Sequence, residues 1–261
     1  MKNSLDVVTI GEAMAMFVAT ETGDLAAVEH FMKRVAGAEL NVATGLARLG
    51  LKVGWVSRVG KDSFGRFVLH SLAKEGIDAR GVSEDSRYAT GFQMKSKVEN
   101  GTDPIVEYFR KGSAASHLSP DDFNAAYFAS ARHLHVSGVA AALSESSYAL
   151  LERAAHTMKA QGKTIIVSEH RLYFLNGIAD RIVLMEHGKL KQSWSARDFA
   201  LLSTEQIKAL GLRSYTTTRL ELPETMPSRN DTPAVEVRDL AIGYEKGEPV
   251  AQNLNFCVYP G

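Results

Sequence analysis

Gly162, Lys163 and Thr164 have the residue types that end a phosphate-binding loop, in which glycine amides and a lysine hold phosphate groups. That loop also requires a glycine five positions before Gly162, where this chain has Thr157. A phosphate-binding loop follows a strand and opens a helix, whereas this stretch follows a predicted helix and opens a predicted strand. We therefore predict a structural connection here and not a nucleotide site.

A second set of residues could recognise hydroxyl groups and a carboxylate. Asn41 has both donors and acceptors, and the missing side chain of Gly37 lets the backbone approach a ligand. Arg110 can pair with a carboxylate as a planar fork, and Tyr108 precedes it by two residues. For an isolated residue, a turn cap at Asn41 and a solvated strand position for Arg110 are the simpler interpretations. A site therefore depends on the elements that bring these residues together.

Those elements alternate between strands and helices. Asp6 to Ile10 is a short apolar run that predicts a buried strand, and Ala38 to Leu49 has apolar residues at helical spacing before Gly50. The same signals predict strands at Val53 to Val59, Leu134 to Val136 and Thr164 to Val167, a helix capped by Asp62 or Ser63 that runs to Glu75, and a helix capped by Ser144 that runs to Gln161. This order predicts an α/β fold with a parallel, doubly wound sheet.

Between these elements, Ala89 to Arg110 contains two alternating segments joined around Asn100 and Gly101. This residue pair is typical of a tight hairpin because both residues tolerate positive φ. We interpret the segment as a β flap that could close over a ligand and exclude water.

Composition limits the function classes. Thirty basic residues balance thirty acidic ones among 261, so no overall charge favours nucleic acid as a partner. Cys257 is the only cysteine, which fits a reducing compartment, and no apolar run is long enough to span a membrane. We expect a cytoplasmic location.

Several spaced motifs resemble ribokinase-like (PfkB) sugar kinases over residues 5–164, and within that family 2-keto-3-deoxygluconate kinases. They are Ala36-Gly37-Ala38 with Asn41, Leu46 to Gly50, Val59 to Gly65, Gly11 to Met14, and Tyr108 to Ser116. The resemblance implies a sugar site formed by Gly37, Ala38, Asn41, Tyr108 and Arg110, with Arg110 on the substrate carboxylate. It also implies phosphoryl transfer from ATP with Mg as the activity of the parent family.

The family's catalytic Gly-Ala-Gly-Asp segment does not occur in this sequence, and Ser168 to Leu172 replaces its Asp-Pro-Asn-Leu-Arg segment. Phosphoryl transfer needs a base for the hydroxyl proton and groups that hold the moving phosphate. We therefore assign no catalytic residue and expect an inactive or only sugar-binding chain. Because ligands of open α/β sheets lie beyond the carboxyl ends of the strands, Glu169 and His170 are expected to project towards the sugar crevice.

From Thr164 to Leu190 the sequence resembles the end of an ABC-type ATPase domain, closest to energy-coupling-factor transporters, with His170 at the place of the switch histidine. Residues 234–261 resemble the opening of a second such domain, with Tyr244 at the place of the aromatic residue that stacks on adenine. A strand-end histidine and a hairpin tyrosine are the plainer interpretations.

These resemblances predict a chimeric, truncated chain. Its segments are a kinase half at 1–164, an ABC fragment at 165–212, a linker at 213–233 and a truncated second ABC domain at 234–261. Within the ABC fragment we predict strands at Arg181 to Met185 and up to Trp194, a turn at His187-Gly188, and a helix opened by a capping box at Ser203.

The alternative function is an interaction or regulatory piece derived from an ABC transporter subunit. The ABC segment that docks on transporter subunits is missing, so we rank those partners lower. A small sugar acid is the expected partner, and self-association through an exposed sheet edge is also expected.

Overall fold

The structure is a computed structural model that describes residues 5–99, 101–169, 172, 178–212, 233, 235–242 and 251–258. The chain divides into two compact units, Met1–Tyr215 and Thr216–Gly261, and each is described by itself.

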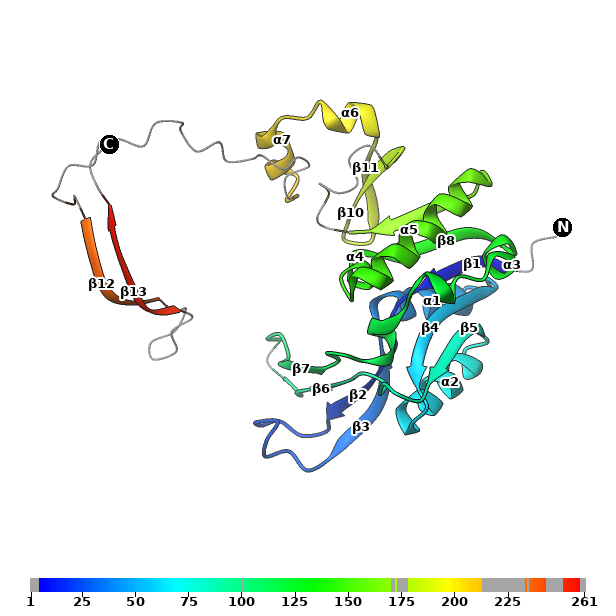
Figure 1. Ribbon diagram of the computed structural model, residues 1–261, viewed down its shortest axis with the longest axis horizontal. Helices are drawn as coiled ribbons and strands as arrows, with labels where there is room; N and C mark the ends of the chain where they lie inside the picture. Colours follow the sequence, from blue (N-terminus) through cyan, green and yellow to red (C-terminus); the bar gives the residue numbers. More distant parts are fainter. Residues whose placement is uncertain are drawn as a thin grey trace. The chain divides into compact units, whose positions relative to one another are not determined.

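The first unit contains a five-stranded sheet in which every neighbouring pair is parallel (Figure 1). In spatial order its strands are β5 (Asp78–Asp85), β4 (Val53–Gly60), β1 (Leu5–Ile10), β8 (Ala131–Ser137) and β9 (Thr164–Ser168). The first strand in the chain lies in the middle, as expected when a chain winds outward in both directions. The predicted α/β fold with a parallel sheet is therefore confirmed.

Helices pack on both faces of this sheet. Trp55 and Val56 are neighbours in β4, so their buried side chains face opposite sides. On the Trp55 side the core includes residues of α1 (Ala38–Arg48) and α2 (Ser63–Lys74). On the Val56 side it includes residues of α3 (Ala125–Ala129), α4 (Gly138–Ala141) and α5 (Glu145–Ala160).

Short-range capping determines where the longer helices begin, as predicted. The side chain of Asp62 accepts a hydrogen bond from the amide of Gly65 at 2.8 Å and caps α2. Ser144 accepts from the amide of Ser147 at 3.1 Å and caps α5. These side-chain oxygens satisfy amides that have no partner within the helix.

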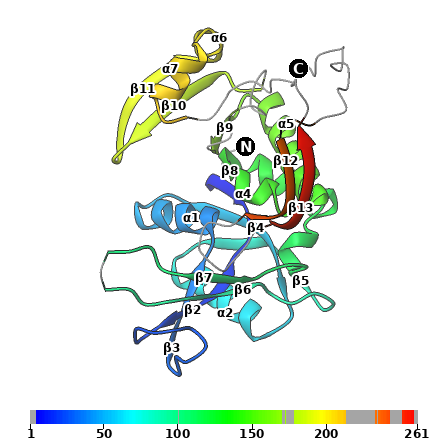
Figure 2. The ribbon, with the colours of Figure 1, turned by 90° about the vertical axis from the view of Figure 1, so that its left-hand side faces the viewer.

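Four strands form a second sheet, the flap, in the order β3 (Phe31–Ala36), β2 (Met14–Ala19), β6 (Phe92–Lys95) and β7 (Val106–Phe109). Figures 1 and 2 show these strands together, away from α5. The sequence predicted only β6 and β7. The register of β6 and β7 is centred on Asn100 and Gly101, where the turn was predicted, although the paired strands end at Lys95 and Val106. Asn100 lies outside the described residues, so the tight turn itself stays a prediction.

Beyond β9, the first unit continues with β10 (Arg181–Glu186), β11 (Lys189–Ser195), α6 (Ala196–Ala200) and α7 (Thr204–Ala209). The strands form an antiparallel hairpin, and the positive φ of His187 and Gly188 confirms the predicted turn. Ser203 and Gln206 form the predicted capping box. A small core around Phe199 holds these elements together.

The second unit contains one described antiparallel hairpin, β12 (Val235–Ile242) and β13 (Ala251–Val258). Four cross-strand pairs are apolar on both strands: Val235 with Val258, Val237 with Phe256, Leu240 with Leu254, and Ile242 with Ala251. Glu236 and Cys257 form the fifth pair. Most of the hairpin's side chains are exposed.

Several predictions lie on residues outside this description. They include His170, Tyr244 and the linker over most of 213–233. Among the helices in the described parts of the chain, none combines the length and the apolar character needed to cross a membrane.

Candidate functional site

The predicted sugar residues lie where the flap meets the parallel sheet. Gly37 is the single residue between β3 of the flap and α1, and it serves as the N-cap of that helix. Its φ of 153° lies in the region that favours glycine. A Cβ at this position would meet the backbone carbonyl oxygen of Glu12, so the turn that follows β1 and the start of α1 are in direct contact.

Two further predicted residues, Ala38 and Asn41, occupy the first turn of α1 and are exposed. The amide of Asn41 donates to the carbonyl of Gly37 at 2.9 Å. Because Asn41 is exposed, the donor and acceptor groups of its side-chain amide are open to solvent. The turn cap considered for Asn41 is therefore absent, since Gly37 is the capping residue.

Arg110 follows β7 directly and forms an ion pair with Glu12 through its Nη2 atom. The side chain of Glu12 is 2% exposed and that of Arg110 is 26% exposed, so the pair has one buried and one accessible partner. This contact brings Arg110 next to the turn that touches Gly37. The structure thus brings Gly37 and Arg110, which are distant in the sequence, to the same residue, Glu12. Ala38 and Asn41 follow Gly37 in the first turn of α1.

Tyr108 lies on β7, two residues before Arg110, and pairs with Gln93 of β6. β7 ends at Phe109, so strand alternation does not place the side chain of Arg110. Tyr108 is 57% exposed, while its cross-strand partner Gln93 is buried. The flap therefore presents an accessible ring two residues before the partly exposed guanidinium of Arg110.

Glu12 is the central residue of this site, and the sequence analysis did not assign it a role. It accepts a hydrogen bond from Ser113 Oγ at 2.5 Å in addition to its contact with Arg110. Burial raises the pKa of Glu12 despite the opposing effects of Ser113 and Arg110, and the charge of Glu39 adds to the increase. The sequence signal that could have identified Glu12 is its position as a charged residue soon after a predicted buried strand.

Glu39 is a second buried carboxylate, and it comes from the first turn of α1. It accepts hydrogen bonds from Ser137 Oγ at the end of β8 and from the amide of Ala140 at 3.2 Å. Burial raises the pKa of Glu39, and these donors oppose the increase. Gly11 has no Cβ, and the carboxylate of Glu39 occupies the space that this leaves.

Glu169 follows β9, and its carboxylate occupies the space above Gly138, where a Cβ on that glycine would overlap it. Gly138 is the first residue of α4 and follows the end of β8. Glu169 therefore lies at the carboxyl edge of the sheet, as the sequence analysis expected. His170, which was expected beside it, is outside the described residues.

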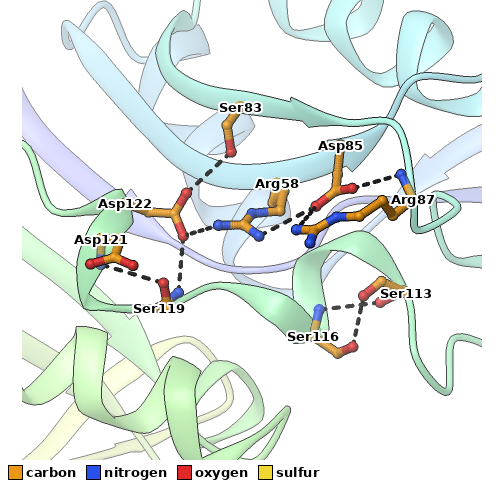
Figure 3. Close-up of polar contacts among 9 residues, drawn as sticks. All are labelled: Arg58, Ser83, Asp85, Arg87, Ser113, Ser116, Ser119, Asp121 and Asp122. Atoms are coloured by element: carbon orange, nitrogen blue, oxygen red, sulfur yellow. Dashed lines mark hydrogen bonds and ion pairs between the residues drawn. The ribbon is translucent and has the colours of Figure 1, made fainter.

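A buried polar network fixes the segment that returns from the flap to the sheet (Figure 3). Arg58 of β4 forms ion pairs with Asp85 at 3.4 Å and with Asp122 at 2.7 Å. Asp122 also accepts from Ser83 Oγ at 3.2 Å and from the amide of Ser119 at 2.9 Å. Asp122 ends a 3-10 turn (Pro120–Asp122) a few residues after Ser113, so the network holds the chain that carries Ser113 against β4 and β5.

A cavity of about 420 Å³ lies between the flap and the start of α2. It is lined by Asp62, Ser63, Phe64, Ala89, Thr90, Gly91, Phe92, Phe109, Lys111, Gly112 and Ser113. Phe92 and Phe109 stack there with ring centroids 4.6 Å apart. The cavity adjoins the Glu12 site, because Ser113 both lines it and donates to Glu12.

Two features of the described residues bear on whether the chain can hold a metal ion or a nucleotide phosphate. Within the described ranges, no group of three or more His, Cys, Asp or Glu side chains is arranged to hold a metal ion. Lys163, the lysine of the apparent phosphate loop, donates from Nζ to the carbonyls of Ala129 and Ala131 at 2.6 Å each. This lysine therefore closes the end of α3, as expected for a structural connection.

Comparisons with known proteins agree with the kinase part of the sequence analysis. A family description reading "pfkB family carbohydrate kinase" matches residues 4–182. A 2-dehydro-3-deoxygluconokinase of Bacillus subtilis is 49% identical over 162 residues, which are 62% of this chain and 50% of that protein.

Solved structures give the same result. A PfkB protein from Polaromonas has 51% identity and a TM-score of 0.62, with 64% of this chain and 56% of that chain covered. A sugar kinase of Pyrococcus horikoshii in complex with ATP has 26% identity and a TM-score of 0.55, with 62% and 52% covered. The chain spans about half the length of the curated relatives it matches.

The family match continues past Thr164 to residue 182, through part of the segment that we interpreted as an ABC fragment. These findings do not support the ABC-ATPase interpretation or the predicted chimera. The match covers more than half of the chain, and the aligned structures share its parallel sheet. The chain therefore belongs to the pfkB family of carbohydrate kinases.

Proposed function

We propose that this chain recognises 2-keto-3-deoxygluconate, or a sugar acid of the same class, between the start of α1 and the flap. The observation that carries this proposal is the position of Arg110, whose partly exposed guanidinium is held by the buried Glu12 beside Gly37. A planar cation of this kind suits a carboxylate better than a hydroxyl group. The name of the Bacillus subtilis relative supports the choice of sugar acid.

Each proposed residue has a separate task. Arg110 binds the carboxylate through guanidinium nitrogens other than the Nη2 atom that contacts Glu12. Asn41 binds sugar hydroxyls with its exposed side-chain amide, and Tyr108 packs its ring against the carbon skeleton. Gly37 and Ala38 let the backbone of the helix start approach the ligand, because neither carries a long side chain.

Kinases of this family use ATP and Mg. For this chain we propose sugar binding only, because the Gly-Ala-Gly-Asp segment that supplies the base for phosphoryl transfer in this family does not occur among the 261 residues. No observation on the described residues favours the alternative role as a transporter interaction piece. The segment boundaries at 164, 212 and 233 stay a prediction.

Isothermal titration calorimetry with 2-keto-3-deoxygluconate tests the proposal. The purified chain should bind the sugar acid, and Arg110→Gln should weaken binding by roughly 10- to 100-fold, since a hydrogen bond to a charged group contributes about 1.5–3 kcal/mol. Arg66→Gln is the matched control, because Arg66 is exposed on α2 and donates to Ser63. Equal affinities for the wild type and Arg110→Gln would contradict the proposed role of Arg110.

A further inference from the structure

The charges around Arg110 do not balance once a ligand carboxylate is added. Glu12 and Glu39 are both buried, and Arg110 is the cation that acts on both of them. Ser113 and Ser137 contribute neutral donors to these carboxylates. Two carboxylates and one guanidinium already leave an excess negative charge if both acids are ionised.

A sugar acid bound at Arg110 would bring a third carboxylate to the same cation. The cost of burying several like charges around one opposite charge is large, and proteins usually avoid it by protonating one of the acids. The ligand is a strong acid relative to a buried glutamate, so its own carboxylate remains ionised near neutral pH. One of the two glutamates is therefore the group expected to take up a proton.

Glu12 is better placed than Glu39 to accept that proton. Its charge is compensated by the contact with Arg110, and the ligand would compete for this same guanidinium. Glu39 instead receives a backbone amide from Ala140 and the hydroxyl of Ser137, and binding at Arg110 leaves these two donors in place. Hydrogen bonds to the ionised form favour that form, so Glu39 keeps more of its stabilisation.

We propose that Glu12 is a positioning residue that couples binding of a sugar acid at Arg110 to the uptake of one proton from solvent. The inference rests on the proposed function, because it assumes that a ligand carboxylate binds Arg110. Without ligand, the ionised Glu12 orients Arg110. With ligand, Glu12 is protonated, still accepts a hydrogen bond from Ser113 through its carbonyl oxygen, and no longer repels the bound carboxylate.

The experiment is calorimetric titration of the full chain with 2-keto-3-deoxygluconate from pH 5 to 9, in pairs of buffers with different ionisation enthalpies. The dependence of the binding heat on the buffer gives the number of protons taken up. We expect uptake that approaches one proton per ligand over part of this range. By linkage, Kd then rises by up to tenfold for each pH unit there.

A neutral ligand provides a control that needs no variant. In 3-deoxyfructose a hydroxymethyl group replaces the carboxylate, so it adds no charge at Arg110 and should bind without proton uptake. Glu12→Gln should bind the sugar acid with a Kd that is nearly independent of pH, and more tightly than the wild type at the alkaline end. Glu39→Gln should retain the uptake. Circular dichroism of both variants verifies their folding.

Two kinds of failure can be separated. If Arg110→Gln binds the sugar acid as well as the wild type does, the proposed function fails. If binding depends on Arg110 but the wild type takes up no proton at any pH, the coupling is overturned while the binding site stands. Uptake that persists in Glu12→Gln and disappears in Glu39→Gln would also overturn the assignment to Glu12.

Discussion

The backbone carbonyl oxygen of Glu12 occupies the position that a Cβ on Gly37 would take. Gly37→Ala should therefore displace the turn after β1 from the start of α1, and the φ of 153° adds strain for any residue with a side chain. We expect a loss of about 1–3 kcal/mol in the free energy of unfolding, together with weaker sugar binding. Urea unfolding and calorimetric titration measure the two effects.

Gly45→Ala is the matched control on the same helix. A Cβ at Gly45 would have no heavy atom within 4 Å, and this glycine lies in the interior of α1. Alanine is favoured over glycine there by roughly 0.5–1 kcal/mol, so this variant should be more stable than the wild type. Similar losses for Gly37→Ala and Gly45→Ala would show that the contact with Glu12 has no special role.

Glu39 should make stability depend on pH in a defined direction. Burial raises its pKa in the folded state above the ordinary value of 4.5. The folded chain then holds the proton more tightly than the unfolded chain, so this contribution to stability is complete below pH 4.5 and is lost as pH rises through the folded pKa. Glu39→Gln does not titrate, so its stability relative to the wild type should increase over that interval.

Denaturant unfolding of both proteins from pH 4 to 9 gives this difference directly. Taking the difference also removes the contributions of carboxylates that both proteins share. Glu39→Ala serves as the second variant, because it leaves Ser137 Oγ and the amide of Ala140 without their acceptor. It should cost about 1–3 kcal/mol. A constant difference between Glu39→Gln and the wild type across the range would contradict the raised pKa.

We expect Lys163 to stabilise the fold and not to bind phosphate. Its Nζ donates to three carbonyls between the end of α3 and the start of β8, those of Phe128, Ala129 and Ala131. Lys163→Met keeps the aliphatic stem and removes these bonds, so it should lower the free energy of unfolding by about 1–3 kcal/mol. Lys159→Met is the control, because Lys159 is half exposed and, among the described residues, donates to Ile178 O and Asp180. A lower Tm for Lys163→Met but not for Lys159→Met is the expected result.

The proposal that this chain binds the sugar acid without phosphorylating it can be tested by an assay of kinase activity. With ATP, Mg and 2-keto-3-deoxygluconate, the 261-residue chain should release no ADP above background in a coupled assay. The reason is that the segment expected to supply the catalytic base, Gly-Ala-Gly-Asp, does not occur in the sequence. The Bacillus subtilis relative serves as the positive control. Measurable turnover that disappears in Arg110→Gln would show that other residues supply this chemistry.

The sequence predicted elements whose signals are local. The caps at Asp62, Ser144 and Ser203 mark three helices, and each lies where it was expected. The missed strands differ in their signals. β2 is a six-residue apolar run of the kind that predicted β1, so it could have been recognised. β5 has a glycine and several charged residues, and its conformation depends on pairing with β4 across α2.

In the candidate site, too, the residues that depend on contacts far along the chain were harder to predict than those with a local signal. Arg110 and Asn41 were identified from residue type and family resemblance, which need no knowledge of their neighbours. Glu12 is adjacent to a predicted strand and would ordinarily be solvated. Its burial results from Arg110 and Ser113, which approach it only after the flap has formed. A sequence pattern cannot reveal a buried charge whose partner lies so far along the chain.

The flap and the sheet are joined by very short segments. Residues 11–13 connect β1 to β2, Gly37 alone connects β3 to α1, and residues 110–113 lead from β7 to the next turn (Ala114–His117). Segments of this length leave little freedom for rotation, so the flap is held in a nearly fixed orientation against the sheet.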